Sequence, residues 1–246
     1  MKNVPRKLIC LILVVALAAG LSGCASKEVR DAYRMGEAAM NAGRYADAAD
    51  YFGPLDGYKD SELYLDTIYF EAMNLLEAGT YPEAAGIFAA LARYDVQDAA
   101  FFALIAGAYD CLYALDAVSA YALLEGTDRT RPEAAAAYAA LELLCFEDTL
   151  LIRPEYVAEE LVSGKVTPEV TNAAEDPYMD ILVYAMTSHI TDSVYTQYRE
   201  YCMRAFPDSF QEESNNYFTI QIEGQTYYVC NFHALYGGLV IKIPRY

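Results

Sequence analysis

The sequence contains no tryptophan, only two histidines, and about half as many basic as acidic residues (17 Lys and Arg, 35 Asp and Glu). Two histidines exclude a histidine-rich metal site. The formal net charge of −18 repels nucleic acid and anionic lipid headgroups, so nucleic-acid binding is excluded and a neutral or basic partner is favoured. The same charge would also keep an exported protein soluble, and this simpler explanation stays open.

Motifs of well-known catalytic chemistry are missing too. The sequence has no Gly-x-Ser-x-Gly and no phosphate-binding glycine loop. Two pairs of adjacent carboxylates, Glu159-Glu160 and Glu212-Glu213, would diverge on a helix and are expected to be solvated. We therefore expect a non-enzymatic protein with no cofactor, no catalytic residue and no metal site. An exported hydrolase is the least favoured alternative.

The N-terminus has the organisation of a secretory signal. Three basic residues among the first seven precede an apolar or small run from Leu8 to Leu21. The next residues, Leu21-Ser22-Gly23-Cys24, resemble a bacterial lipobox. In that family the cysteine receives diacylglycerol and the chain is cut just before it, so the resemblance implies a signal peptide over 1–23 and a lipid on Cys24. It also implies a location on the extracytoplasmic face of the cell membrane, in a bacterial cell envelope. The alternative is an uncleaved anchor, because the apolar run approaches the length of a spanning helix.

Four further cysteines would remain in the mature chain: Cys111, Cys145, Cys202 and Cys230. An even number in an exported protein permits disulfides, with Cys111–Cys145 and Cys202–Cys230 as candidate pairs. Each of the four lies among apolar neighbours, and no two have the spacing of metal ligands. Buried free thiols are therefore the favoured interpretation.

A repeat of 36 residues occupies the N-terminal half. The segment Gly43–Ala48 aligns without gaps with Gly79–Ala84, and both continue at the same offsets to a phenylalanine, a leucine and a tyrosine. A fixed period with two apolar-periodic helices per unit indicates a helical-hairpin repeat. A third, degraded unit is expected, in which Ala117 to Leu124 corresponds to Ala84 to Leu91 without the preceding glycine and tyrosine.

The pattern Gly-x-Tyr-x-x-Ala-x-x-x-Phe-x-x-Leu resembles the core of the tetratricopeptide repeat (TPR), with Gly36 and Ala72 at the family's small position in the first helix. The period of 36 departs from the family's usual period of about 34, and the closing proline is absent. In this family the first helices line a groove that binds a protein or peptide. Carried over by position, the resemblance implies a partner-binding face made of Tyr33, Glu37, Asn41, Tyr69, Met73 and Glu77. Packing in the core is the alternative for the aromatic residues and the methionine.

Helical patterns continue to residue 206, and then the period changes. Helices are predicted over Glu155–Ser163, Tyr178–His189 and Asp192–Phe206, with a polar connector at Val170–Asp176. Three strands follow. The first two alternate on either side of a hairpin turn at Glu223-Gly224, and the third covers Leu239–Ile243.

The chain is therefore predicted to be mostly α. TPR-like helical-hairpin repeats (24–149) would follow the signal peptide (1–23), and a small α+β C-terminal domain (150–246) would contain a three-stranded antiparallel sheet. The leading functional hypothesis is a membrane-anchored scaffold that binds a protein or peptide. The alternative is a lipoprotein that binds a small ligand or envelope polymer in a C-terminal pocket lined by Tyr217, Tyr227, Tyr228, His233 and Tyr236.

Overall fold

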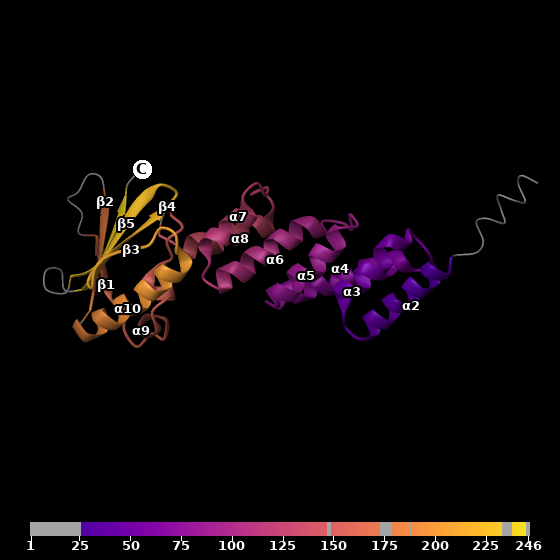
Figure 1. The fold of residues 1–246 in the computed structure, drawn as a ribbon, viewed down its shortest axis with the longest axis horizontal. Coiled ribbons are helices and arrows are strands. Elements are labelled where there is room, and N and C mark those ends of the chain that lie inside the picture. Colours follow the sequence, from indigo (N-terminus) through magenta and orange to yellow (C-terminus); the bar gives the residue numbers. More distant parts are fainter. Residues whose placement is uncertain (1–25, 147–148, 173–178, 187, 233–237, 245–246) are drawn as a thin grey trace, which may run out of the picture. The chain divides into compact units, whose positions relative to one another are not determined.

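The computed structural model describes residues 26–146, 149–172, 179–186, 188–232 and 238–244. The predicted signal peptide and Cys24 lie outside these residues. The chain divides into two compact units, unit 1 up to Gly107 and unit 2 from Ala108 onward, with the boundary inside one helix. Unit 1 is helical, and unit 2 combines helices with an antiparallel sheet (Figure 1). The mostly helical character that the sequence predicted is confirmed.

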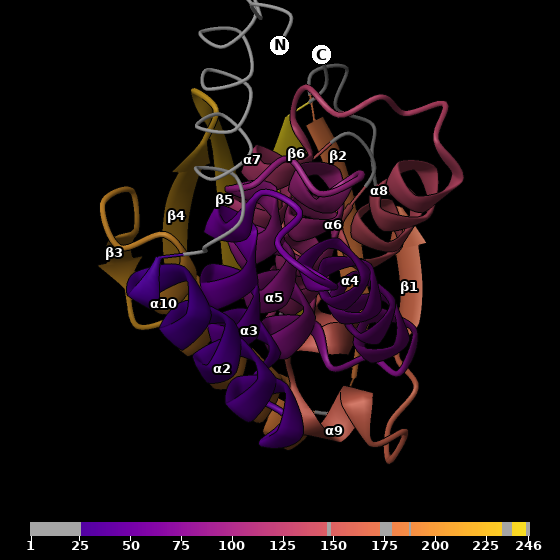
Figure 2. The same cartoon turned by 90° about the vertical axis from the view of Figure 1, so that its right-hand side faces the viewer.

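Unit 1 consists of successive antiparallel helices, which lie side by side in Figures 1 and 2. They are α2 (Lys27–Asn41), α3 (Tyr45–Phe52), the short 3-10 helix η1 (Gly53–Leu55), α4 (Ser61–Glu77), α5 (Tyr81–Ala92) and the first part of α6 (Ala99–Tyr113). Unit 2 begins with the rest of α6, followed by α7 (Ala117–Leu124) and α8 (Pro132–Leu144).

The turns after α2, α4 and α6 share one hydrogen bond at a constant 36-residue spacing. The bonds run from Arg44 N–H to the Ala39 carbonyl (2.9 Å), from Thr80 N–H to the Leu75 carbonyl (2.9 Å), and from Asp116 N–H to the Cys111 carbonyl (2.8 Å). Gly43 and Gly79 precede the first two donors with φ of 68° and 77°. This left-handed conformation ends many helices, and glycine adopts it at the lowest cost.

The third turn keeps this geometry without glycine. Leu115, which stands 36 residues after Gly79, has φ of 59°. Helix α7 begins at Ala117, 36 residues after the start of α5 at Tyr81, and Ala120 therefore matches Ala84. The sequence alignment of Ala117 with Ala84 was wrong by three residues, because the left-handed turn is recognised from its glycine and here a leucine occupies that position.

Burial follows the same period. The small residue of the second helix, Ala48, Ala84 or Ala120, is fully buried in each case, and so is the large residue one turn later, Phe52, Phe88 or Leu124. In unit 1 the Phe52 ring stacks on Tyr64 with centroids 4.5 Å apart and planes 5° apart. Each helix pair therefore buries one small and one large side chain at fixed places, as a helical repeat requires.

Gly36 is small because the Phe52 ring lies against it. A Cβ at residue 36 would come within 2.7 Å of that ring, which is already held by Tyr64. We predict that Gly36→Ala lowers the free energy of unfolding by about 1–3 kcal/mol, the usual cost of overpacking a core. Gly86→Ala is the matched control, since a Cβ there meets nothing within 4 Å. Alanine favours a helix, so this control should stabilise by up to about 1 kcal/mol. Chemical denaturation of both variants tests the pair, and equal effects would contradict it.

The rest of unit 2 is an antiparallel sheet with a long helix on one face (Figure 1). The strands are β1 (Glu169–Asn172), β2 (Met179–Ala185), β3 (Gln211–Ser214), β4 (Tyr217–Ile222), β5 (Gln225–Phe232) and β6 (Gly238–Pro244), in the spatial order β1-β2-β6-β5-β4-β3. The long helix is α10 (Ser188–Ala205). Two short elements, η2 (Pro154–Tyr156) and α9 (Glu159–Val162), precede the sheet.

The C-terminal predictions were right for three strands and wrong for the rest of the sheet. Strands β4, β5 and β6 and the turn at Glu223-Gly224 are confirmed, but the sheet has six strands and not three. The predicted helix Tyr178–His189 is mostly strand β2, and the predicted connector Val170–Asp176 begins in strand β1. The helix predicted over Glu155–Ser163 is only η2 and α9, whereas Asp192–Phe206 lies largely within α10.

One core joins the helices of unit 2 to its sheet. It includes Ala120 of α7, Leu141 of α8, Tyr198 of α10 and Ile241 of β6. The Tyr198 hydroxyl donates to the Ile152 carbonyl at 2.7 Å, which fixes α10 to the segment after α8. The domain change suggested by the sequence between residues 149 and 150 falls inside this unit.

The four cysteines are free thiols. Cys202 belongs to the core under α10, whereas Cys230 packs with Val183 and Val240 in a separate small cluster. A Cys202–Cys230 bridge is therefore absent, and a Cys111–Cys145 bridge is absent as well. Burial raises the pKa of the Cys145 thiol to about 12, so this side chain behaves as a packing residue.

Helix α9 is attached to α10 by a network around Glu160. Its carboxylate accepts hydrogen bonds from the Ser193 hydroxyl at 2.5 Å and from Gln197 Nε2 at 2.7 Å. The other end of the Gln197 amide, Oε1, accepts from the Glu159 N–H at 2.7 Å. The Ser193 hydroxyl bond, which favours the charged form, lowers the pKa of Glu160 below its usual value of 4.5. Glu160 is thus a structural carboxylate and not the solvated one that the sequence suggested.

This network makes part of the stability depend on pH. A carboxyl group whose pKa is lower in the folded state than in the unfolded state stabilises the fold in its charged form. This stability is fully present above the unfolded-state pKa and is lost as the pH falls through the folded-state pKa. We predict that Glu160→Gln costs about 1 kcal/mol at pH 7, and that the difference from the parent chain disappears below the ordinary carboxyl range. Denaturation of both proteins from pH 7 to pH 3 measures it. A difference that stays constant over this range would contradict the assignment.

Candidate functional site

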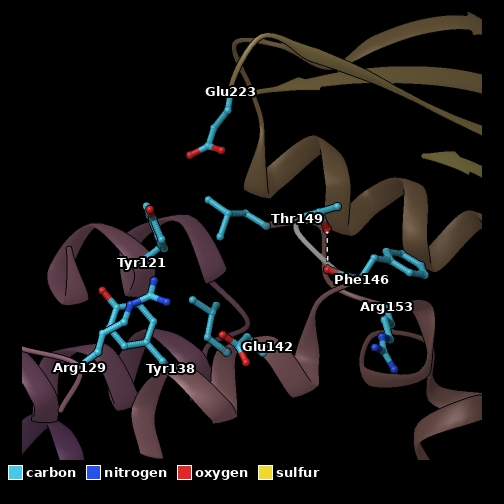
Figure 3. Close-up of a pocket in the computed structure, with 10 residues that line it drawn as sticks. Tyr121, Arg129, Tyr138, Glu142, Phe146, Thr149, Arg153 and Glu223 are labelled. Atoms are coloured by element: carbon cyan, nitrogen blue, oxygen red, sulfur yellow. Dashed lines mark hydrogen bonds between the residues drawn. The ribbon is translucent and has the colours of Figure 1, made fainter. Parts of the chain in front are cut away.

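Unit 2 contains a cavity of about 690 Å³ on the side of α7 and α8 (Figure 3). This volume lies in the range of about 300–1,000 Å³ that is usual for small-molecule sites. The lining residues are Tyr121, Arg129, Tyr138, Leu141, Glu142, Phe146, Thr149, Leu150, Arg153 and Glu223.

The floor of the cavity is apolar. Leu141 comes from α8, and Phe146 and Leu150 come from the segment that folds back after this helix; all three are buried. An isolated bridge between Cys145 and Ile152 closes that segment, and the Phe146 N–H donates to the Leu151 carbonyl at 3.0 Å. This hydrogen bond holds Phe146 next to Leu151.

Arg129 and Tyr138 form one wall. The guanidinium carbon of Arg129 lies 3.7 Å from the centre of the Tyr138 ring, within the range of cation–π contact. The Tyr138 hydroxyl donates to the Leu124 carbonyl at 2.7 Å, so the ring is held as a platform. Within the described residues, Arg129 makes no hydrogen bond or ion pair. Its face is occupied by the ring, and none of the described residues supplies an acceptor to the N–H donors at its edge.

Arg153 lines the opposite part of the cavity in Figure 3. Its Nε donates to the Cys145 carbonyl at 2.8 Å, which holds the half-buried side chain in place. Among the residues that the structure describes, its Nη atoms have no carboxylate partner.

Two exposed glutamates also line the cavity. Glu142 lies on α8, one turn after Tyr138. Glu223 lies in the β4–β5 turn, where it has φ of 51° and Gly224 has φ of 81°. Two positive φ values are typical of a type I′ hairpin turn, in which a residue with a side chain costs about 1–2 kcal/mol. Figure 3 shows the Glu223 carboxylate directed from this turn toward the cavity.

The six residues that the sequence assigned to a partner-binding face lie elsewhere, in unit 1. Tyr33 and Tyr69 are core residues with 4% and 7% of their surface exposed. Glu37 and Met73 are half-buried, and Asn41 and Glu77 are exposed. None of the six lines the second cavity, about 440 Å³, which lies around the turn at Gly43 and the start of α5.

The C-terminal aromatic residues do not form the predicted pocket together. Tyr227 is buried in the core of unit 2, opposite Ile220 on β4. Tyr217 and Tyr228 stack on each other with centroids 6.2 Å apart, on the other face of the sheet. Neighbouring residues of a strand point to opposite faces, so Tyr227 and Tyr228 cannot line one pocket. His233 and Tyr236 lie outside the described residues.

The comparisons with known proteins give no match, neither among family models, nor among curated proteins, nor among solved structures. Across the described ranges, no group of three or more His, Cys, Asp or Glu side chains could hold a metal ion. No helix in the described part of the chain is both long and apolar enough to cross a membrane.

Proposed function

We propose that the chain is a bacterial lipoprotein that is anchored to the membrane through a lipid on Cys24 and that binds a protein or peptide through TPR-like repeats. The proposal for the anchor rests on the sequence alone: a basic segment, an apolar run, and Leu-Ser-Gly-Cys at residues 21–24. It assigns the protein to the extracytoplasmic face of the cell membrane.

The anchor can be tested by metabolic labelling with a radioactive fatty acid. The parent chain should take up label and sediment with membranes, whereas Cys24→Ala should take up none. Cys202→Ala is the matched control, because its thiol is buried in the folded chain. Equal labelling of the parent and Cys24→Ala would overturn the proposed anchor.

The repeated turn is the observation that carries the scaffold proposal. Three turns have the same hydrogen bond, and at a spacing of 36 each has a residue in the left-handed conformation, which is Gly43, Gly79 or Leu115. Helical repeats of this kind form an extended concave binding surface, and in TPR proteins the first helices line it. The resemblance to TPR proteins suggests that the surface includes the accessible members of the predicted face, Asn41 and Glu77, with Glu37 and Met73 beside them. Tyr33 and Tyr69 would support it from the core.

Charge reversal on this face tests the scaffold proposal. Glu37→Lys/Glu77→Lys changes one half-buried and one exposed position, neither of them in the core, so the fold should be retained, and the acidic face should lose a basic or neutral partner. Glu62→Lys/Glu83→Lys makes the same change in charge at other exposed sites on α4 and α5. Crosslinking in intact cells should give the same adduct for the parent and the control and no adduct for the test variant. Identical adducts from all three would contradict the proposed face.

The cavity in unit 2 favours a second candidate function, the binding of a small ligand or envelope polymer. Its buried apolar side chains, its aromatic platform and its charged groups offer a small ligand both apolar and polar contacts. A thermal-shift screen of small polar ligands tests it, with filling of the cavity by Leu141→Phe as the variant that should abolish every positive shift.

A further inference from the structure

Helix α2 carries basic side chains along one side of its first half. Lys27, Arg30 and Arg34 are exposed, and their spacings of three and four residues make them neighbours on the helix surface. We call these three residues the basic stripe. Glu28 points to another side, because successive residues of an α-helix are rotated by about 100°. Asp31 forms an ion pair with Arg34 at 3.2 Å, but exposed pairs of this kind are weak, and the Arg34 side chain stays 77% exposed. The basic stripe is therefore a local positive patch on a chain with a net charge of −18.

The fold keeps the basic stripe on the outside of α2. The Ser26 side chain accepts a hydrogen bond from the Val29 N–H at 3.2 Å and caps the first turn. Tyr33 is buried in the core of unit 1. Lys59 Nζ lies 4.2 Å from the centre of the Tyr33 ring, so the loop that contains Lys59 and Asp60 packs beside this tyrosine, whereas the stripe stays exposed.

The proposed lipid would place this part of α2 next to a bilayer. Cys24 would be the first residue of the processed chain, and one residue, Ala25, separates it from Ser26, where the described structure begins. An extended chain advances at most about 3.6 Å per residue, so Ser26 lies within about 7 Å of the lipid-bearing residue. Neither Cys24 nor Ala25 has a charged side chain once the lipid is attached, so these two residues leave the charge of this end unchanged.

The distances along α2 bring the whole stripe close to the headgroups. Lys27 and Arg34 are about 10 Å apart along the helix, which is close to the distance over which physiological salt screens a charge. Three basic residues bind an anionic surface weakly when the chain is free in solution. A tether of two residues keeps the surface and the stripe together, so a weak contact is made most of the time.

We propose that the basic stripe of α2 docks on anionic lipid headgroups of the bilayer that holds the chain. The acidic residues that dominate the rest of the chain are repelled by the same headgroups, so the contact is confined to the stripe beside the anchor. This inference rests on the anchor in the proposed function, for which it adds a second point of attachment. Asn41, at the other end of α2, is about 21 Å from Lys27 along the helix and stays available to a protein partner.

Hydrogen exchange of the mature, lipidated chain in vesicles tests the inference. Vesicles of neutral phosphatidylcholine are compared with vesicles that also contain anionic phosphatidylglycerol. The α2 amides should exchange about tenfold more slowly on the anionic vesicles, because each basic residue at such a surface contributes about a fivefold factor. Opening of the helix would mix the stripe with Glu28 and Asp31 and so weaken the contact. High salt should abolish the difference, and the α4 amides of the same molecules should exchange equally on both vesicles.

Two variants separate the stripe from a general effect of the surface. Arg30→Gln/Arg34→Gln should remove the difference between the vesicles, and glutamine keeps the helix because its propensity is close to that of arginine. Arg44→Gln/Arg93→Gln makes the same change in charge at exposed sites outside α2 and should behave as the parent chain does. A slower exchange that persists in Arg30→Gln/Arg34→Gln would come from the lower pH at the anionic surface and would overturn the docking.

The remaining outcomes distinguish the docking from the anchor. Equal exchange of α2 on both kinds of vesicle, in a parent chain that sediments with them, would overturn the docking and leave the anchor intact. A chain that sediments with neither kind of vesicle would overturn the anchor, and the docking with it.

Discussion

Replacement of Phe88 by alanine should lower the free energy of unfolding by about 3–5 kcal/mol, the range for deleting a fully buried aromatic ring. The Phe88 side chain has no exposed surface, and its ring packs between two others. Tyr69 meets it edge-on at 5.6 Å, and Phe102 stacks on it at 5.4 Å. These contacts bring α4, α5 and the first part of α6 together, so alanine would leave a cavity between three helices.

Phe70→Ala is the matched control, since the same deletion is made one residue after Tyr69 on a ring that is 62% exposed. Its effect should stay within about 0.5 kcal/mol. Urea denaturation followed by far-ultraviolet circular dichroism measures both variants. Similar losses for the two would show that the core of unit 1 is not centred on Phe88.

Gly238→Ala should destabilise unit 2 by about 3 kcal/mol or more, because it forces a side chain against backbone. Gly238 begins β6 and pairs with Ala185 of β2, and a Cβ there would overlap the Tyr184 carbonyl oxygen. Neither strand can withdraw without breaking the ladder that joins β2 to the rest of the sheet. Tyr184 is itself a core residue, so its movement would disturb packing on that face.

The same denaturation assay, with near-ultraviolet dichroism of the tyrosines, measures the effect. Gly86→Ala again serves as the control, because it adds the same methyl group where nothing lies within 4 Å. A loss below about 0.5 kcal/mol for Gly238→Ala would mean that β2 and β6 do not approach as closely as the structure has them.

An element could be predicted from the sequence where its hydrophobic alternation or its turn residues are distinctive. Strands β4 and β5 were predictable because their residues alternate around a Glu-Gly turn with two positive φ values. Strand β2 was taken for a helix because a short apolar run fits a buried strand or a buried helix equally well. Strand β3 is exposed at all four residues, so it carries no hydrophobic alternation.

The repeats show the same limit. Their period was visible where glycine marks the turn, and it was misaligned where Leu115 adopts that conformation. The cavity had no signal at all in the sequence. Its residues come from α7, the α7–α8 loop, α8, the residues after α8 and a hairpin turn, and no constant spacing relates them. Only the three-dimensional fold brings Arg129 and Glu223 to one site.

The equivalent turns make residues 45–80 of unit 1 an interchangeable module. The segment begins with α3 at Tyr45, and the residue that follows the segment, Tyr81, begins α5. Each of these two helices comes after a turn with the same hydrogen bond. A second copy of residues 45–80 could therefore be inserted after Thr80. At each junction it would meet the same kind of turn, followed by a helix with a buried alanine and a buried phenylalanine at the same positions. The helical array could be lengthened by 36 residues at a time without designing any new contact, which makes its length an independent variable for engineering and for gene duplication.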